Sequence, residues 1–173
     1  MAAVSISVRD ARSAPADRLW IQSVYRDYLD DLNPGTGIFP ALGEVGHRDG
    51  DQIAHWFGDP NNFPLIIVKG TEPVGFARVL RGVAGRPVAR VDYRMAEFFV
   101  MRTRRRLGIG QTAVQLIFSR FAGRWEISEY LRNAAAVSFW RRVVASYTRG
   151  TYQERIVNGE VHQVFDSARP RPA

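Results

Sequence analysis

Hydrophobic and polar residues alternate along this chain with two different periods, and these periods predict its secondary structure. Four segments repeat apolar residues every three or four positions, as amphipathic helices do: residues 15–32, a short segment around Trp56, a segment that ends near Phe121, and residues 133–147. Seven segments alternate apolar with polar residues or form short apolar runs, as strands do: residues 4–8, 64–69, 74–80, 91–101, 125–130, 152–157 and 160–165. The predicted order is therefore β-α-α-β-β-β-α-β-α-β-β.

Turn residues separate these segments. Asn33-Pro34-Gly35 is expected to end the first helix, and a Gly- and Pro-rich stretch to about Arg48 is expected to form a loop. Residues 70–73 and 82–87 predict turns, and Asn158-Gly159 is the strongest short hairpin signal in the chain. The fold class that follows is α/β (α+β), with helices flanking a mixed, mostly antiparallel central sheet.

Composition narrows the functional classes. The chain has 173 residues, 46% of them hydrophobic and 24% charged, which is typical of one soluble globular domain. It has no cysteine, which excludes disulfides, thiolate metal sites and cysteine nucleophiles. Its histidines, His47, His55 and His162, lack metal-ligand spacing, so we expect no metal. No apolar run approaches the ~20 residues of a membrane helix, and no signal peptide is recognisable, so we expect a cytoplasmic protein without membrane partners.

Positive charge is concentrated at one place in the sequence. The formal net charge is +7, and Lys69 is the only lysine, so a genomic preference for arginine could account for the overall balance. That preference does not account for Arg102, Arg104, Arg105 and Arg106, which gather beside two glycines. A nucleic-acid binder would instead spread its arginines along a face with exposed aromatic residues between them, so the cluster favours a compact polyanion.

The stretch from Val100 to Gln111 joins a predicted buried strand to a predicted helix. Gly108 and Gly110 allow the backbone to approach a ligand, and free N–H groups at a helix N-terminus attract an anion. The arginines could add charge-assisted hydrogen bonds. The junction therefore predicts a pyrophosphate site and a phosphorylated carrier, although a tight strand-to-helix turn without a ligand is the alternative.

Two motifs carry a resemblance to a known family. Arg105-Arg106-Leu107-Gly108-Ile109-Gly110 matches Arg/Gln-x-x-Gly-x-Gly/Ala, with Val100 five positions before it, and residues 133–140 match Asn-x-x-Ala followed by an aromatic pair. Together with the element order, they make the chain resemble the GCN5-related N-acetyltransferase (GNAT) superfamily. The resemblance implies a single GNAT-like domain over residues 4–166, followed by an Arg- and Pro-rich tail, residues 167–173, which we expect to fray.

The resemblance implies acetyl-CoA as the co-substrate and assigns residues to it. Backbone groups of Phe98, Phe99 and Val100 would bind the pantetheine arm and the thioester carbonyl, and a bulge in the long strand would make room for the arm. The pyrophosphate would be held by backbone N–H groups of Arg105, Arg106, Leu107, Gly108, Ile109, Gly110 and Gln111. Asn133 and Phe139 would contact the pantetheine or the adenosine side. A plain helix cap for Asn133 and core packing for Phe139 and Trp140 are the alternatives.

The catalytic positions that the resemblance identifies are altered in this chain. Arg94 and Ser128 stand where family members place a glutamate base, and Trp140 stands where they place a tyrosine acid. Glu97 and Glu126 are the remaining candidates for the catalytic carboxylate. The alternatives are a structural ion pair for Glu97, a solvated edge position for Glu126, and catalysis without a dedicated base. Arg94 could orient an acidic group of the substrate or form a surface ion pair with Asp92.

The predicted function is transfer of an acetyl group from acetyl-CoA to a primary amine of a small molecule or peptide, by direct attack on the thioester. The alternatives are a non-catalytic acyl-CoA-binding domain and a basic acetyltransferase that acts on RNA-borne amines. The predicted acceptor pocket combines aromatic and acidic side chains: Tyr25, Tyr28, Asp30, Asp31, Phe39 and Trp56. Edge strands could pair two copies, which leaves a homodimer open.

Overall fold

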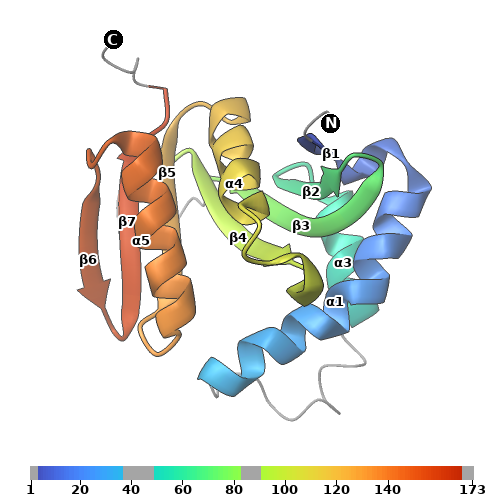
Figure 1. The fold of residues 1–173 in the computed structure, drawn as a ribbon, viewed down its shortest axis with the longest axis horizontal. Helices are drawn as coiled ribbons and strands as arrows, with labels where there is room; N and C mark the ends of the chain where they lie inside the picture. The colour runs from blue at the N-terminus through green and yellow to red at the C-terminus, as the bar shows by residue number, and fades with distance from the viewer. Residues whose placement is uncertain (1–3, 37–48, 83–90, 169–173) are drawn as a thin grey trace.

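A computed structural model describes residues 4–36, 49–82 and 91–168 (Figure 1). Within these ranges seven strands form one sheet in the order β1-β2-β3-β4-β5-β7-β6. The strands are β1 (Ile6–Asp10), β2 (Asn62–Lys69), β3 (Glu72–Arg81), β4 (Tyr93–Val100), β5 (Arg124–Tyr130), β6 (Gln153–Val157) and β7 (Glu160–Asp166). Every neighbouring pair is antiparallel except β4 and β5, which are parallel. The predicted mixed, mostly antiparallel sheet is confirmed.

Helices cover both faces of this sheet (Figure 1). They are α1 (Pro15–Thr36), α3 (Asp49–Gly58), α4 (Ile109–Arg120) and α5 (Ala134–Thr148), with 3₁₀ turns η1 (Ala11–Ser13) and η2 (Arg102–Arg104). Apolar residues of α1 and α3 pack with Phe76 and Phe99 in one core. Those of α4 and α5 pack with Trp125 and Ile127 in a second core on the opposite face. Among the described residues, no helix is both long and apolar enough to cross a membrane.

The predicted element order is confirmed, with one boundary wrong. Asn33-Pro34-Gly35 does not end the first helix near Leu32, because α1 continues to Thr36. Pro34 lies two residues before that end, so its missing N–H removes one bond from the last turn, and its fixed φ is helical. The predicted loop to Arg48, most of the predicted turn at residues 82–87, and the tail beyond residue 168 lie outside the described residues.

Helix α5 shows why its sequence folds as predicted. The Asn133 side chain accepts a hydrogen bond from the Ala136 N–H at 3.1 Å, as an N-cap does. The stripe of Val137, Trp140 and Val144 is buried against the sheet. Trp140 is therefore a core residue, and the core-packing alternative is the observed one.

A bulge in β4 opens the sheet beside β5. Arg78 pairs with Glu97 while the next residue, Val79, pairs with Met95, so one residue of β4 is left without a partner. β4 and β5 are paired only through Tyr93 with Trp125 and Arg94 with Glu126, and Figure 1 shows β4 turning away beyond that point. The predicted bulge is confirmed, and it leaves the end of β4 without a strand partner on the β5 side.

Candidate functional site

Gly108 leaves the start of α4 open at the strand-to-helix junction. It is the N-cap of α4 with a left-handed backbone (φ 74°), and no side chain caps the first turn. The first turn, which starts with Ile109, Gly110 and Gln111, contains no acidic residue. A Cβ at Gly108 would meet nothing within 4 Å, so the space before the helix is open. Uncapped N–H groups at the positive end of a helix dipole are suited to bind a phosphate oxygen.

Gly110 is required by packing rather than by backbone conformation. A Cβ there would lie 3.2 Å from the ring of Phe139. That ring stacks on Phe98, with centroids 5.7 Å apart and planes at 21°. The second glycine of the motif therefore lets α4 approach the β4–α5 contact, next to the end of β4 that β5 leaves unpaired.

Two carboxylates offset part of the positive charge of the four clustered arginines. Arg102 and Arg105 both form an ion pair with Asp31 of α1, and the distance from Arg102 is 2.7 Å. Arg104 forms an ion pair with Glu72 at 2.6 Å. Arg105 also donates to the Val100 carbonyl at 2.9 Å. Of the four arginines, Arg106 alone makes no ion pair within the described ranges. The uncapped backbone N–H groups at the start of α4 therefore lie beside an arginine cluster that is only partly paired.

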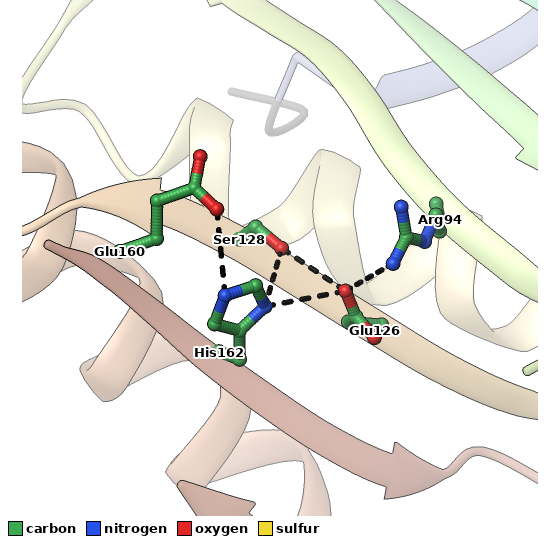
Figure 2. Close-up of polar contacts among 5 residues, drawn as sticks. All are labelled: Arg94, Glu126, Ser128, Glu160 and His162. Atoms are coloured by element: carbon green, nitrogen blue, oxygen red, sulfur yellow. Dashed lines mark hydrogen bonds and ion pairs between the residues drawn. The ribbon is translucent and has the colours of Figure 1, made fainter. Parts of the chain in front are cut away.

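Polar side chains of β4, β5 and β7 form one network on the face opposite α4 and α5 (Figure 2). Glu126 Oε1 accepts hydrogen bonds from Arg94 and, at 3.2 Å, from Ser128 Oγ. His162 Nδ1 lies 3.0 Å from Ser128 Oγ and 3.3 Å from Glu126 Oε1. His162 Nε2 lies 3.4 Å from Glu160 Oε2. Ser128 is exposed, so the network has one end that a substrate can reach.

Two expectations about this network are wrong. Glu126 is not a solvated edge carboxylate: it is 1% exposed, because β5 lies inside the sheet and its neighbours cover the side chain. Arg94 does not pair with Asp92, whose carboxylate instead accepts the Arg124 N–H at 2.8 Å. The sequence did not predict a role for His162 or Glu160 in this network. The register of β5 and β7, which pairs Ser128 with His162, places both residues on the same face of the sheet as Ser128.

Glu97 forms a structural ion pair. Arg78 donates to it at 2.7 Å, and the same guanidinium bonds Asn62 and lies over the Trp56 ring. Burial raises the pKa of Glu97, and the Arg78 contact opposes that rise. The two candidate carboxylates, Glu97 and Glu126, are thus each held by a separate arginine.

The predicted acceptor pocket is mostly core. Tyr25, Tyr28 and Trp56 are 4%, 7% and 3% exposed and pack together between α1, α3 and the sheet. Burial raises the pKa of Tyr28 well above its ordinary value, which suits a core tyrosine. Asp31 binds arginines, Asp30 is exposed, and Phe39 lies outside the described residues. The aromatic residues therefore support the fold and do not line an open pocket.

A second polar cluster lies on the α5 face of β5 and β7. Glu129 accepts a hydrogen bond from Gln163 at 2.7 Å, and Gln163 also contacts Glu154, which pairs with Arg141 of α5. The second carboxylate oxygen of Glu129 is buried without a hydrogen bond. Burial, only partly offset by the Gln163 bond, raises the pKa of Glu129 to about 7.

This raised pKa predicts a loss of stability as pH rises. The folded protein binds a proton that the unfolded chain releases near 4.5, so the free energy of unfolding should fall between about pH 4.5 and 7. The difference between the folded and unfolded pKa of Glu129 corresponds to roughly 3 kcal/mol. Urea unfolding at pH 5 and pH 8 should show this loss in the wild type and a smaller one in Glu129→Gln. Glu72→Gln, at an exposed position, is the control. A Glu129→Gln protein that loses as much free energy of unfolding between pH 5 and pH 8 as the wild type would contradict the prediction.

No metal-binding group of three or more His, Asp or Glu side chains occurs in the part of the chain that is described. The site instead combines an uncapped N-terminus of α4, an unpaired edge of β4, and an exposed serine connected to a buried His–Glu network. Such an arrangement can hold a phosphorylated carrier along β4 and move protons beside it.

Comparison with known proteins identifies the family. The model of the acetyltransferase (GNAT) family matches residues 21–144, which is more than half of the chain. The chain therefore belongs to the GNAT acetyltransferase family. No curated protein matches it.

Solved structures share the fold at low sequence identity. An acetyltransferase from Thermus thermophilus is 16% identical with a TM-score of 0.70, over 96% of this chain and 99% of that one. PaiA N-acetyltransferase from Thermoplasma acidophilum, solved with coenzyme A, is 11% identical with a TM-score of 0.62, over 94% and 99%. Arabidopsis thaliana NAA60, solved with acetyl-CoA, is 12% identical with a TM-score of 0.60, over 94% and 98%. At these identities the likeness establishes the fold alone.

Proposed function

We propose that this protein is an acetyl-CoA-dependent N-acetyltransferase that moves the acetyl group to a primary amine of a small molecule or peptide. The observation that carries the proposal is the uncapped N-terminus of α4 at Gly108, beside the edge of β4 that β5 leaves unpaired. The first feature suits a pyrophosphate and the second suits an extended amide-bearing arm. Family membership and the relatives solved with coenzyme A or acetyl-CoA support the same ligand.

Different residues of the chain would then bind different parts of acetyl-CoA. Backbone groups of residues 98–100 hold the pantetheine and the thioester, and N–H groups of residues 105–111 hold the pyrophosphate. A fixed backbone N–H stabilises the charge that develops on the thioester oxygen during attack. Asn133 caps α5, and Phe139 lies in the second turn of that helix, where it packs against Phe98 and so borders this edge of β4.

Of the two carboxylates proposed for catalysis, Glu126 has the stronger support. Both carboxylates are paired with an arginine, but Glu126 also bonds Ser128, which is exposed. The amine attacks the thioester carbon directly, the C–S bond breaks, and coenzyme A leaves as a thiol.

Calorimetric titration of acetyl-CoA and a thiol-release assay test the proposal together. Three amines serve as probes: spermidine, kanamycin and a hexapeptide with a free α-amine. Binding with thiol release supports an acetyltransferase. Failure of the folded protein to bind acetyl-CoA would sink the proposal.

The second candidate is a non-catalytic acyl-CoA-binding domain, favoured by Arg94, Ser128 and Trp140 at the family's acid–base positions. It predicts binding of acetyl-CoA without thiol release for any amine. An RNA-associated enzyme would in addition show RNA binding that weakens steeply with salt.

A further inference from the structure

We propose that His162 is the base for the attacking amine and that the proton reaches it through Ser128. The hydroxyl of Ser128 takes a proton from the amine and gives its own proton to His162. The inference rests on the proposed function. It gives a role to Ser128, which stands at one of the family's base positions on β5, and to His162 of β7, which lies outside those positions. Its starting point is geometric: His162 Nδ1 and Ser128 Oγ are 3.0 Å apart, and the serine is the exposed member of the pair (Figure 2).

The relay needs one tautomer of His162. Each ring nitrogen faces a carboxylate, Nε2 at 3.4 Å from Glu160 Oε2 and Nδ1 at 3.3 Å from Glu126 Oε1. The relay requires the proton on Nε2, so that Ser128 can turn its hydroxyl proton from Glu126 Oε1 to Nδ1. This is the arrangement of a base held by an orienting carboxylate. The side chain of His162 is 11% exposed, so the amine reaches it through the serine and not directly.

Glu126 stabilises the protonated state. Its Oε1 lies 3.3 Å from His162 Nδ1, where an imidazolium would place its new proton. This carboxylate is 1% exposed, and its ion pair with Arg94 holds it in place. Glu126 is therefore a positioning residue that acts through His162, which explains how a buried carboxylate can contribute to catalysis without touching the amine.

The protons balance along this route. An ammonium R–NH₃⁺ gives one proton to Ser128 Oγ as the serine proton moves to His162 Nδ1. The neutral amine attacks the thioester carbon, a C–N bond forms and the C–S bond breaks. A second amine proton goes to the departing thiolate, the third stays on the amide, and His162 returns its proton to water.

The relay predicts a specific pH dependence. The base must be neutral to accept a proton, so turnover should fall at acid pH. The charged and titratable groups that share this face with His162 are Arg94 of β4, Glu126 and Tyr130 of β5, Arg155 of β6 and Glu160 of β7.

His162→Gln and Ser128→Ala test the relay with the fastest of the three amines. We expect kcat to fall by at least about 100-fold in His162→Gln, with an unchanged KM for acetyl-CoA and loss of the acid limb of the pH profile. Ser128→Ala should lower kcat to a similar order. His55→Gln, at a histidine that is 67% exposed on α3, is the matched control and should behave as the wild type.

Two results would overturn the relay while leaving the proposed function intact. The first is a His162→Gln enzyme that folds, binds acetyl-CoA and keeps the wild-type kcat and pH limb. The second is an acetyl group on Ser128, found by mass spectrometry after incubation with acetyl-CoA alone, because the serine would then be a nucleophile.

A measurement without an acceptor separates the two proposals. The chain has three histidines, so ¹⁵N spectra of histidine-labelled protein can be assigned with the two histidine variants. A bare Nδ1 and a protonated Nε2 on His162 support the relay, and the opposite tautomer overturns it. Absence of acetyl-CoA binding or of thiol release in the wild type would instead count against the proposed function.

Discussion

Gly108→Trp is expected to abolish acetyl-CoA binding in a protein that still folds. The Cβ position at Gly108 faces open space, so an indole there would lie in front of the α4 N-terminus without a clash in the core. It would block the N–H groups of the first turn, and each charge-assisted hydrogen bond lost costs about 1.5–3 kcal/mol. Losing two such bonds weakens binding by at least about 100-fold.

The control for this prediction is Gly150→Trp. Gly150 follows α5, has a left-handed backbone with φ 80°, and its Cβ position also faces open space. Both substitutions place an L-residue in the left-handed region, so both should lower the free energy of unfolding by about 1–2 kcal/mol. Calorimetry should find binding lost in the first variant and kept in the second. Wild-type affinity in a folded Gly108→Trp protein would show that the carrier does not use this helix end.

The sequence predicts the junction well because its determinants are local. Gly108 needs a left-handed backbone, Gly110 needs the absence of a Cβ, and both demands are met by residue type at a fixed position in a motif. The same holds for Asn158-Gly159, where both residues have positive φ in the hairpin turn. Hydrophobic periodicity adds the element order, because each strand and helix buries one face.

The network of Glu126, Ser128 and His162 is harder to predict because its contacts are distant in sequence. Glu126 and Ser128 meet His162 only through the β5–β7 register, 34 to 36 residues apart. Strand parity gives the face of a side chain but not its partner across the sheet. Arg94 illustrates the limit: Asp92 lies two residues away along the chain, yet the arginine binds Glu126 on the neighbouring parallel strand.

Arg94→Ala is expected to destabilise the protein more than the loss of any surface ion pair. The Arg94 and Glu126 side chains are 17% and 1% exposed, and the second oxygen of Glu126 already lacks a hydrogen bond. Removing the guanidinium leaves a buried carboxylate without its cation, which costs about 3–5 kcal/mol. The exposed pair of Arg104 with Glu72 is the control, and Arg104→Ala should cost no more than about 1 kcal/mol.

The double variant Arg94→Met/Glu126→Leu distinguishes two causes of that loss of stability, an unpaired buried charge and lost packing. If the cost of Arg94→Ala is the penalty of an unpaired buried charge, replacing both partners by apolar side chains should recover most of it. Urea unfolding at one pH, with the slope checked for each variant, measures all four proteins. An Arg94→Ala cost no larger than that of Arg104→Ala would mean that Glu126 finds another partner. A double variant that stays destabilised would mean that packing, rather than charge, holds β4 to β5 where the two strands pair. A stable but inactive double variant would be consistent with a pair kept for the His162 relay and not for stability.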